Sequence, residues 1–195
     1  MKHSIYFIGG ASASGKSTVA RLLAAQEERS IVELDNFYDI LESATRDKRF
    51  LEKTTQKIAL ELVSQLLAAN GFCIVEGGWI PPFEAKKLKD RSQGRFYPVY
   101  CGYLNGKAKD RLRKIRDGKS HWLTKKPSEV ARAYLRDQLK RSHWYQKQCK
   151  KYDLPFFDFS NFGDGVTALS LDYCRWRQAA AYSSTVAPAL FYNAC

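Results

Sequence analysis

Residues 10–17 read GASASGKS and fit the pattern GxxxxGK[ST], which constrains this chain more than any other segment. A short apolar run at residues 4–9 precedes them, and residues 16–26 continue with apolar positions at helical spacing. A glycine-rich turn between a strand and a helix lets successive backbone N–H groups point at phosphate oxygens, and the helix N-terminus adds partial positive charge. The pattern therefore predicts a loop that binds a nucleoside triphosphate with Mg²⁺.

The residue types in this loop predict distinct roles. We expect Lys16 to reach the β- and γ-phosphates, the Ser17 hydroxyl to bind Mg²⁺, and Thr18 to support the α-phosphate. The expected cofactors are therefore ATP and Mg²⁺. The other expected nucleotide-binding residues of the loop are Gly10, Ala11, Ser12, Ala13, Ser14 and Gly15.

Strand-like and helix-like segments alternate along the chain. The predicted strands are residues 4–9, 31–34, 72–76, 95–103 and 154–159. The predicted helices are residues 16–26, 53–69, 81–91, 107–116, 127–150 and 165–177. This alternation predicts an α/β fold with a five-stranded parallel sheet and helices on both faces, although Pro98 is unfavourable inside a strand. We expect a single domain over residues 1–178, and the tail at 179–195 stays unassigned.

Composition excludes several classes of protein. The chain has 195 residues, of which 45% are hydrophobic, so it can form a sizeable core. No stretch approaches the roughly 18–20 apolar residues of a membrane span, and the apolar run near the N-terminus is too short for a signal peptide. Five scattered cysteines predict reduced thiols rather than a disulfide framework. We therefore expect a cytoplasmic protein without a membrane partner.

The net charge of +12 is concentrated in one part of the chain. Residues 86–151 contain 21 Lys and Arg and 5 acidic residues, a balance of +16, whereas the remainder has a balance of −4. Such a block can bind nucleic acid phosphates, form solvated helix faces, or place a few arginines against a nucleotide. Charge alone leaves these three interpretations open.

Other P-loop classes fit the sequence less well. A switch GTPase needs NKxD and DxxG motifs, and neither is present. A motor or helicase normally needs a longer chain. A small kinase or a nucleotide-dependent accessory protein remains.

Two segments carry a family resemblance. IGGASASGKSTVARLLA at residues 8–24 and ELDNFYD at residues 33–39 resemble the P-loop kinases of the uridine kinase and nicotinamide riboside kinase group. The resemblance continues weakly through IVEGG and KDRLRKIRDGK, and it fades over residues 41–70. It implies a P-loop kinase-like three-layer fold with a short basic lid at about residues 107–126. It also implies transfer of the γ-phosphoryl group of ATP to a hydroxyl of a nucleoside or ribosyl compound.

The resemblance also implies roles for two acidic residues. Asp35 matches the catalytic acid of the group, which accepts a proton from the acceptor hydroxyl or orients it. Glu76 lies where a Walker B carboxylate holds the water shell of Mg²⁺. The alternatives are that Asp35 caps a turn after a strand and that Glu76 is a surface acid at a strand end.

The basic segment DRLRKIRD at residues 110–117 resembles a kinase lid. Arg113 and Arg116 share one helical face and are expected to neutralise charge on the transferred phosphoryl group, ahead of Arg111. A solvated face is the alternative for each arginine. The expected acceptor contacts, each of which could instead be structural, are Phe37, Tyr38, Arg46 and Trp79. Positions further along the chain that could reach the site are His121, Trp122, Asn161 and Phe162.

The sequence leaves other functions open. The acceptor could be another metabolite, an antibiotic or a nucleotide sugar, as for a zeta-toxin-like kinase. A nucleic-acid-linked P-loop ATPase would use the basic block, and a regulatory protein would bind nucleotide without turnover. We expect a small-molecule acceptor as the partner, while the basic block leaves nucleic acid open and the oligomeric state is not predicted.

Overall fold

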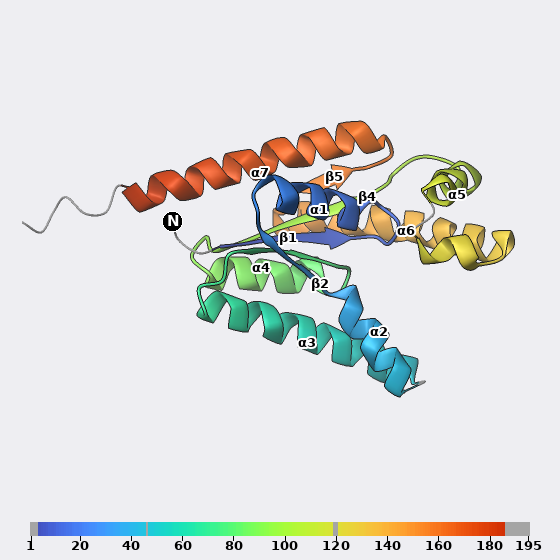
Figure 1. Ribbon diagram of the computed structural model, residues 1–195, viewed down its shortest axis with the longest axis horizontal. Coiled ribbons are helices and arrows are strands. Elements are labelled where there is room, and N and C mark those ends of the chain that lie inside the picture. Colours follow the sequence, from blue (N-terminus) through green and yellow to red (C-terminus); the bar gives the residue numbers. More distant parts are fainter. Residues whose placement is uncertain (1–3, 46, 119–120, 186–195) are drawn as a thin grey trace, which may run out of the picture.

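Five short segments pair as parallel strands in one sheet, as the sequence predicts (Figure 1). The computed structural model describes residues 4–45, 47–118 and 121–185. In spatial order the strands are β2 (Ser30–Glu33), β3 (Cys73–Glu76), β1 (Ile5–Gly10), β4 (Phe96–Gly102) and β5 (Phe156–Asp158). Because all five run in parallel, their carboxyl ends meet at one edge of the sheet.

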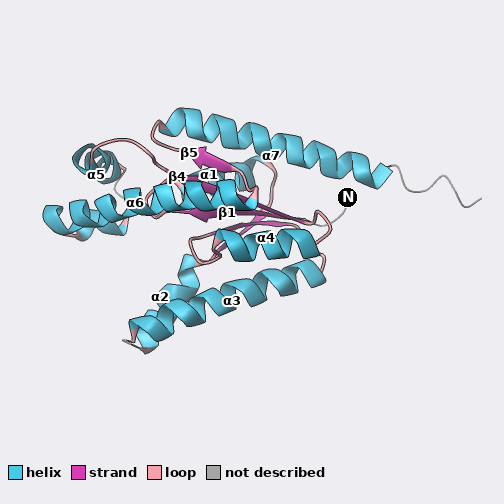
Figure 2. Ribbon diagram, turned by 180° about the vertical axis from the view of Figure 1, so that it is seen from behind, coloured by secondary structure: helices cyan, strands magenta, loops and turns pink. Residues whose placement is uncertain are grey.

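Helices cover both faces of the sheet and complete three layers (Figures 1 and 2). On one face lie α1 (Lys16–Gln26) and α7 (Phe162–Thr185), and on the other lie α3 (Lys48–Ala68), α4 (Pro82–Arg91) and α6 (Ser128–Tyr152). Side chains of the central strand alternate between the two cores, with Phe7 packed toward α3 and Tyr6 packed toward α7. The α/β class and the parallel sheet are therefore confirmed.

Pro98 is accommodated because of where β5 begins. It pairs with Phe7 of β1 on one side. On the other side β5 pairs only with residues 100–102 of β4, so the missing N–H of Pro98 is not needed there.

A helical hairpin after β2 is the main element that the sequence analysis does not anticipate. Residues 35–44 form α2 (Asp35–Ala44), and α3 begins at Lys48 rather than at residue 53. The reason for the earlier start is an N-cap, since the Asp47 carboxylate accepts hydrogen bonds from the backbone N–H groups of Arg49 and Phe50.

Two further segments pack at the end of α6. Helix α5 (Ala108–Asp117) and the 3₁₀ helix η1 (Trp122–Lys125) form a small apolar cluster with α6 that includes Ala13 of the loop after β1. At the other end of the chain, α7 continues through residues 179–185, which the sequence left unassigned, and residues 186–195 lie outside the described part. Within the described ranges, no helix combines the length and apolar character that a membrane span requires.

Candidate active site

The loop between β1 and α1 curves tightly at the carboxyl edge of the sheet. Ala13 has φ +58° and Gly15 has φ +103°, both in the left-handed region. A Cβ on Gly15 would lie 2.5 Å from the Phe162 ring, so that aromatic ring packs directly on the loop. The Ser14 hydroxyl is buried and has no hydrogen-bond partner among the described residues. A curved loop with a buried, unpartnered hydroxyl is suited to phosphate oxygens.

Lys16 lies folded over this loop. Its side chain is only 6% exposed, and Nζ donates a hydrogen bond to the Ala11 carbonyl at 3.1 Å. A buried ammonium group with one partner keeps two further N–H groups for phosphate oxygens. The position agrees with the role that the sequence predicts for Lys16, which stays a prediction.

Ser17 and Glu76 meet beside the loop. The Ser17 hydroxyl donates a hydrogen bond to Glu76 Oε1 at 2.9 Å, and Glu76 is 2% exposed. Its second oxygen, Oε2, is buried and has no partner within the described ranges. Burial raises the pKa of Glu76, while nearby Lys16 acts in the opposite direction.

This pair fits a magnesium site. Mg²⁺ prefers oxygen ligands and usually binds to one or two protein groups together with phosphates and water. The hydroxyl of Ser17 and the unpartnered oxygen of Glu76 are donors of that kind. No group of three or more His, Cys, Asp or Glu suited to a metal occurs in the described part of the chain, so phosphates and water would supply the remaining ligands.

We expect the Glu76→Gln variant to gain stability relative to the parent as pH rises. Because burial raises the pKa of Glu76, the folded state holds this proton more tightly than the unfolded chain does. The contribution of Glu76 to the free energy of unfolding therefore falls as the pH rises above 4.5, the ordinary pKa of this carboxyl. It stops falling once the carboxyl is ionised in the folded protein. The difference in melting temperature, variant minus parent, should increase across this window, measured without nucleotide.

Glu52 on α3 is the control for this measurement, since it is exposed. The Glu52→Gln variant should show no such pH-dependent difference. A difference in melting temperature between Glu76→Gln and the parent that is constant with pH would contradict this prediction.

The Glu76→Gln variant should also bind Mg-ATP more weakly than the parent, because an amide is a poorer magnesium ligand than a carboxylate.

Asp35 begins α2 directly after β2, on the strand beside the one that ends in Glu76. The Trp79 indole N–H donates a hydrogen bond to Asp35 Oδ1 at 2.7 Å, which fixes the carboxylate. Tyr38 stacks on Trp79 with ring centroids 4.9 Å apart. Gly77 lies between these segments with φ +148°, and a Cβ there would be 2.8 Å from Leu34 Cβ. The carboxylate is exposed and therefore accessible to an acceptor.

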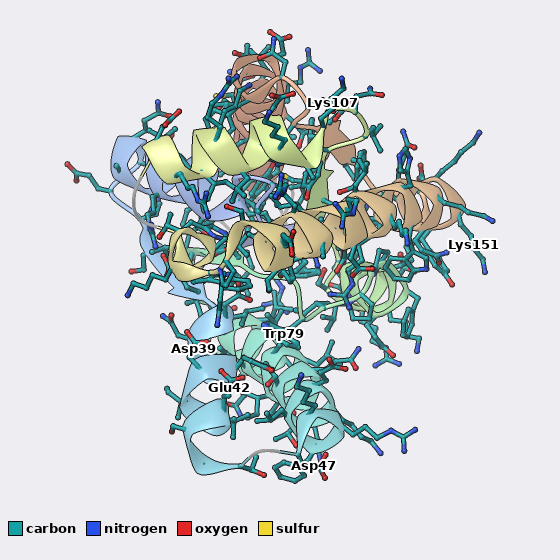
Figure 3. All side chains as sticks on the ribbon, turned by 90° about the vertical axis from the view of Figure 1, so that its right-hand side faces the viewer. Asp39, Glu42, Asp47, Trp79, Lys107 and Lys151 are labelled. Carbon is teal, nitrogen blue, oxygen red and sulfur yellow. The ribbon has the colours of Figure 1, made fainter. Side chains whose placement is uncertain are left out.

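The expected acceptor contacts have different surroundings. Figure 3 shows Trp79 between α6 and the hairpin of α2 and α3, and Tyr38 lies on it. Phe37 is half-buried and packs against the core under α3, and Trp79 also packs against that core. Arg46 lies outside the described residues. The structure thus brings Tyr38 and Trp79 together beside Asp35, while Phe37 contacts the core.

The three arginines of the expected lid differ in how they lie relative to the phosphate-binding loop. Arg111, which the sequence ranked last, donates to the Ala13 carbonyl at 2.9 and 3.1 Å, and its guanidinium lies 3.5 Å from the Tyr103 ring centre. Arg116 instead donates to Ser128 Oγ at 3.0 Å. The Arg113 side chain is 73% exposed, and its carboxylate partner at 3.9 Å is the neighbouring Asp110. The structure therefore places Arg111, not Arg113 or Arg116, against the phosphate-binding loop.

Two other residues contact or approach the loop. The Ser12 backbone N–H donates to Gln138 Oε1 at 3.0 Å, and Gln138 is buried on α6. His121 Nδ1 accepts from the Leu123 N–H, and burial together with Lys16 lowers the pKa of His121. The contact of Gln138 with the loop was not predicted, although an amide on the apolar face of the predicted helix is the signal that could have found it.

Solved structures with a similar fold are P-loop kinases. Shikimate kinase from Bacteroides thetaiotaomicron has a TM-score of 0.53 and 17% identity, and the match covers 85% of this chain and 95% of that one. A gluconokinase from Sinorhizobium meliloti 1021 has a TM-score of 0.52 and 16% identity, over 88% and 96% of the two chains. No protein-family model matches this chain, and no curated protein matches it. At such identities the similarity shows the fold alone, which is that of the P-loop kinases.

Proposed function

We propose that this protein is an ATP-dependent kinase that transfers the γ-phosphoryl group of Mg-ATP to a hydroxyl of a small molecule. The observation that carries the proposal is the convergence of four polar side chains at one edge of the sheet. Lys16 and Ser17 follow β1, Glu76 ends β3 against Ser17, and Asp35 follows β2. This is the crevice outside the carboxyl ends of parallel strands in which α/β enzymes bind ligands.

These residues support a direct in-line transfer. Asp35 accepts the proton of the acceptor hydroxyl, and the oxygen of that hydroxyl forms a bond to the γ-phosphorus of ATP. The bond between the γ-phosphorus and the oxygen that bridges it to the β-phosphate breaks, which releases ADP. Lys16 neutralises charge on the β- and γ-phosphates. Ser17 and Glu76 hold Mg²⁺, which when bound neutralises the phosphate oxygens. The hydrogen bond from Trp79 keeps the Asp35 carboxylate oriented.

For the acceptor we propose a nucleoside or ribosyl compound. The stacked rings of Tyr38 and Trp79 beside Asp35 support this class, because an aromatic surface next to the catalytic carboxylate suits a planar base. The resemblance of residues 33–39 to the uridine kinase and nicotinamide riboside kinase group points to the same class. Shikimate and gluconate, the acceptors named for the similar folds, are the alternatives.

A coupled assay of ADP release tests this proposal. Mg-ATP is supplied with uridine, cytidine, nicotinamide riboside, shikimate or gluconate, for the parent and for Lys16→Ala. We expect one ribosyl compound to stimulate ADP release strongly in the parent and not in the variant, because Lys16 lies over the phosphate-binding loop. Stimulation by shikimate or gluconate alone would replace the acceptor class. ATP binding without stimulation by any of these compounds would favour a regulatory role.

A further inference from the structure

A groove runs between α5 and α6, and its wall includes Arg111, which also contacts the phosphate-binding loop. Two adjoining cavities, of about 440 and 360 Å³, lie along this junction, and both are lined by Lys109 and Arg132. Figure 3 shows the two helices side by side on the face toward the viewer, with Lys107 at the start of α5. The other basic residues that line the two cavities are Lys107, Arg111, Lys114, Arg136, Arg113 and Arg116.

These cations have few counter-charges within the protein. Among the described residues, Arg113 alone of the groove cations has an ion pair, at 3.9 Å from Asp110. Arg116 and Arg132 donate to uncharged oxygens of Ser128. Asp110 and Asp117 are the carboxylates in the cavity walls, against eight lysines and arginines. Clustered, unpaired cations create a strong positive potential that attracts an anion.

The positive surface continues along α6 beyond the groove. The basic stripe, which we define as Arg132, Arg136, Lys140, Lys147 and Lys151, lies on one face of the helix at spacings of four and seven residues. At 1.5 Å per residue it extends roughly 28 Å, and Figure 3 shows Lys151 at its far end. The opposite face of α6 is buried in the core. A single phosphorylated metabolite is too short for this stripe, whereas a chain of phosphates can follow it.

An exposed aromatic side chain borders the stripe. Trp144 is 43% exposed although it is a large apolar residue. Proteins that bind single strands combine a positive groove that follows the phosphates with aromatic rings on which unpaired bases stack. This combination favours a nucleic acid over a chain of phosphates without bases.

We propose that the groove between α5 and α6, together with the basic stripe, binds single-stranded nucleic acid. The bound strand is not the phosphoryl acceptor, because the Asp35 site lies beside the acidic residues of α2. Figure 3 shows two of them, Asp39 and Glu42, on the other side of α6 from α5. The strand-binding surface is therefore separate from the Asp35 site, although Arg111 adjoins both the groove and the phosphate-binding loop. Because strand binding is measured without ATP, failure of one proposal leaves the other intact.

Fluorescence anisotropy with a labelled oligouridylate of about 16 nucleotides tests the inference, without ATP and at salt between roughly 50 and 200 mM. The test variant replaces Arg136, Lys140 and Lys147 by Ala. The control replaces Lys48, Lys53 and Lys57 by Ala, which removes the same charge from exposed positions of α3. Alanine suits a helix, so both variants should fold.

We expect the stripe variant to bind the oligonucleotide about tenfold more weakly than the parent. The slope of log K against the logarithm of the salt concentration should become smaller in magnitude by about 2, since each of the three lost phosphate contacts removes about 0.7. The control should bind within about twofold of the parent. Equal weakening in the two variants, or no binding by the parent at the lowest salt, would overturn the proposal.

A second variant distinguishes nucleic acid from other phosphate chains. Trp144→Ala should weaken oligouridylate binding about fivefold or more, because base stacking on that ring is lost. The same variant should leave the binding of inorganic polyphosphate unchanged. If Trp144→Ala binds oligouridylate as the parent does, the ligand is not recognised through its bases and the assignment to nucleic acid fails.

Discussion

The Asp35→Asn variant is expected to lose about a thousandfold in kcat for the compound that stimulates ADP release. The amide of asparagine cannot accept the proton of the acceptor hydroxyl, and this loss corresponds to about 4 kcal/mol of transition-state stabilisation. Its side-chain oxygen can still accept the hydrogen bond that Trp79 donates to Asp35 Oδ1 at 2.7 Å. The fold and the affinity for Mg-ATP should therefore change little, as measured by thermal unfolding and calorimetry.

Asp39, one turn further along α2, provides the matched control. It carries the same charge and is exposed (Figure 3). Asp39→Asn should keep kcat within about twofold, because a surface charge change usually has a small effect. Full activity of Asp35→Asn would mean that Asp35 does not accept the proton of the acceptor hydroxyl. An equal loss of kcat in Asp39→Asn would show that the negative charge of α2 matters in general, and not proton transfer to Asp35.

The Gly10→Ala variant should lower the free energy of unfolding by about 3–5 kcal/mol, or prevent folding. Gly10 has φ +125°, and a Cβ there would lie 1.9 Å from the Cys101 carbonyl oxygen. That carbonyl accepts a hydrogen bond from the Ala11 N–H at 3.1 Å, so it cannot move without opening the start of the phosphate-binding loop. Urea unfolding measures the loss.

Gly106 separates the two causes of this effect. Its φ of +107° is, like that of Gly10, unfavourable for alanine, but among the described residues other than its two chain neighbours no atom lies within 4 Å of the position of its Cβ. Gly106→Ala should therefore cost only the backbone strain, about 1–2 kcal/mol. Equal losses in the two variants would show that backbone strain, and not the contact with Cys101, makes glycine necessary at position 10.

Local patterns were enough to predict the sheet and the phosphate-binding loop. The five apolar runs correspond to the five strands, and the helix after GASASGKS begins at Lys16 as expected. Hydrophobic period and glycine spacing act over a few residues, so they can be recognised without knowing the fold. The same holds for Glu76, which ends an apolar run and lies beside Ser17.

Helix α2 was not predicted, although its apolar residues have helical spacing. Phe37, Ile40, Leu41 and Ala44 follow the spacing of an amphipathic helix, but the segment has only ten residues and none of its side chains is fully buried. Ile40 is 65% exposed. The start of α3 was placed five residues late because the capping carboxylate of Asp47 precedes the apolar period.

The amino-acid sequence by itself determined the five strands, the helices other than α2, the glycine-rich loop after β1, and the acids that follow β2 and end β3, because each depends on neighbours a few residues away. Only the tertiary structure decided which arginine contacts the loop, that Trp79 orients Asp35, and that Gln138 binds the Ser12 N–H. These contacts join residues 98, 44 and 126 positions apart. Packing of whole helices against the sheet brings such pairs together, and no short pattern records which side chain then lies within hydrogen-bond distance.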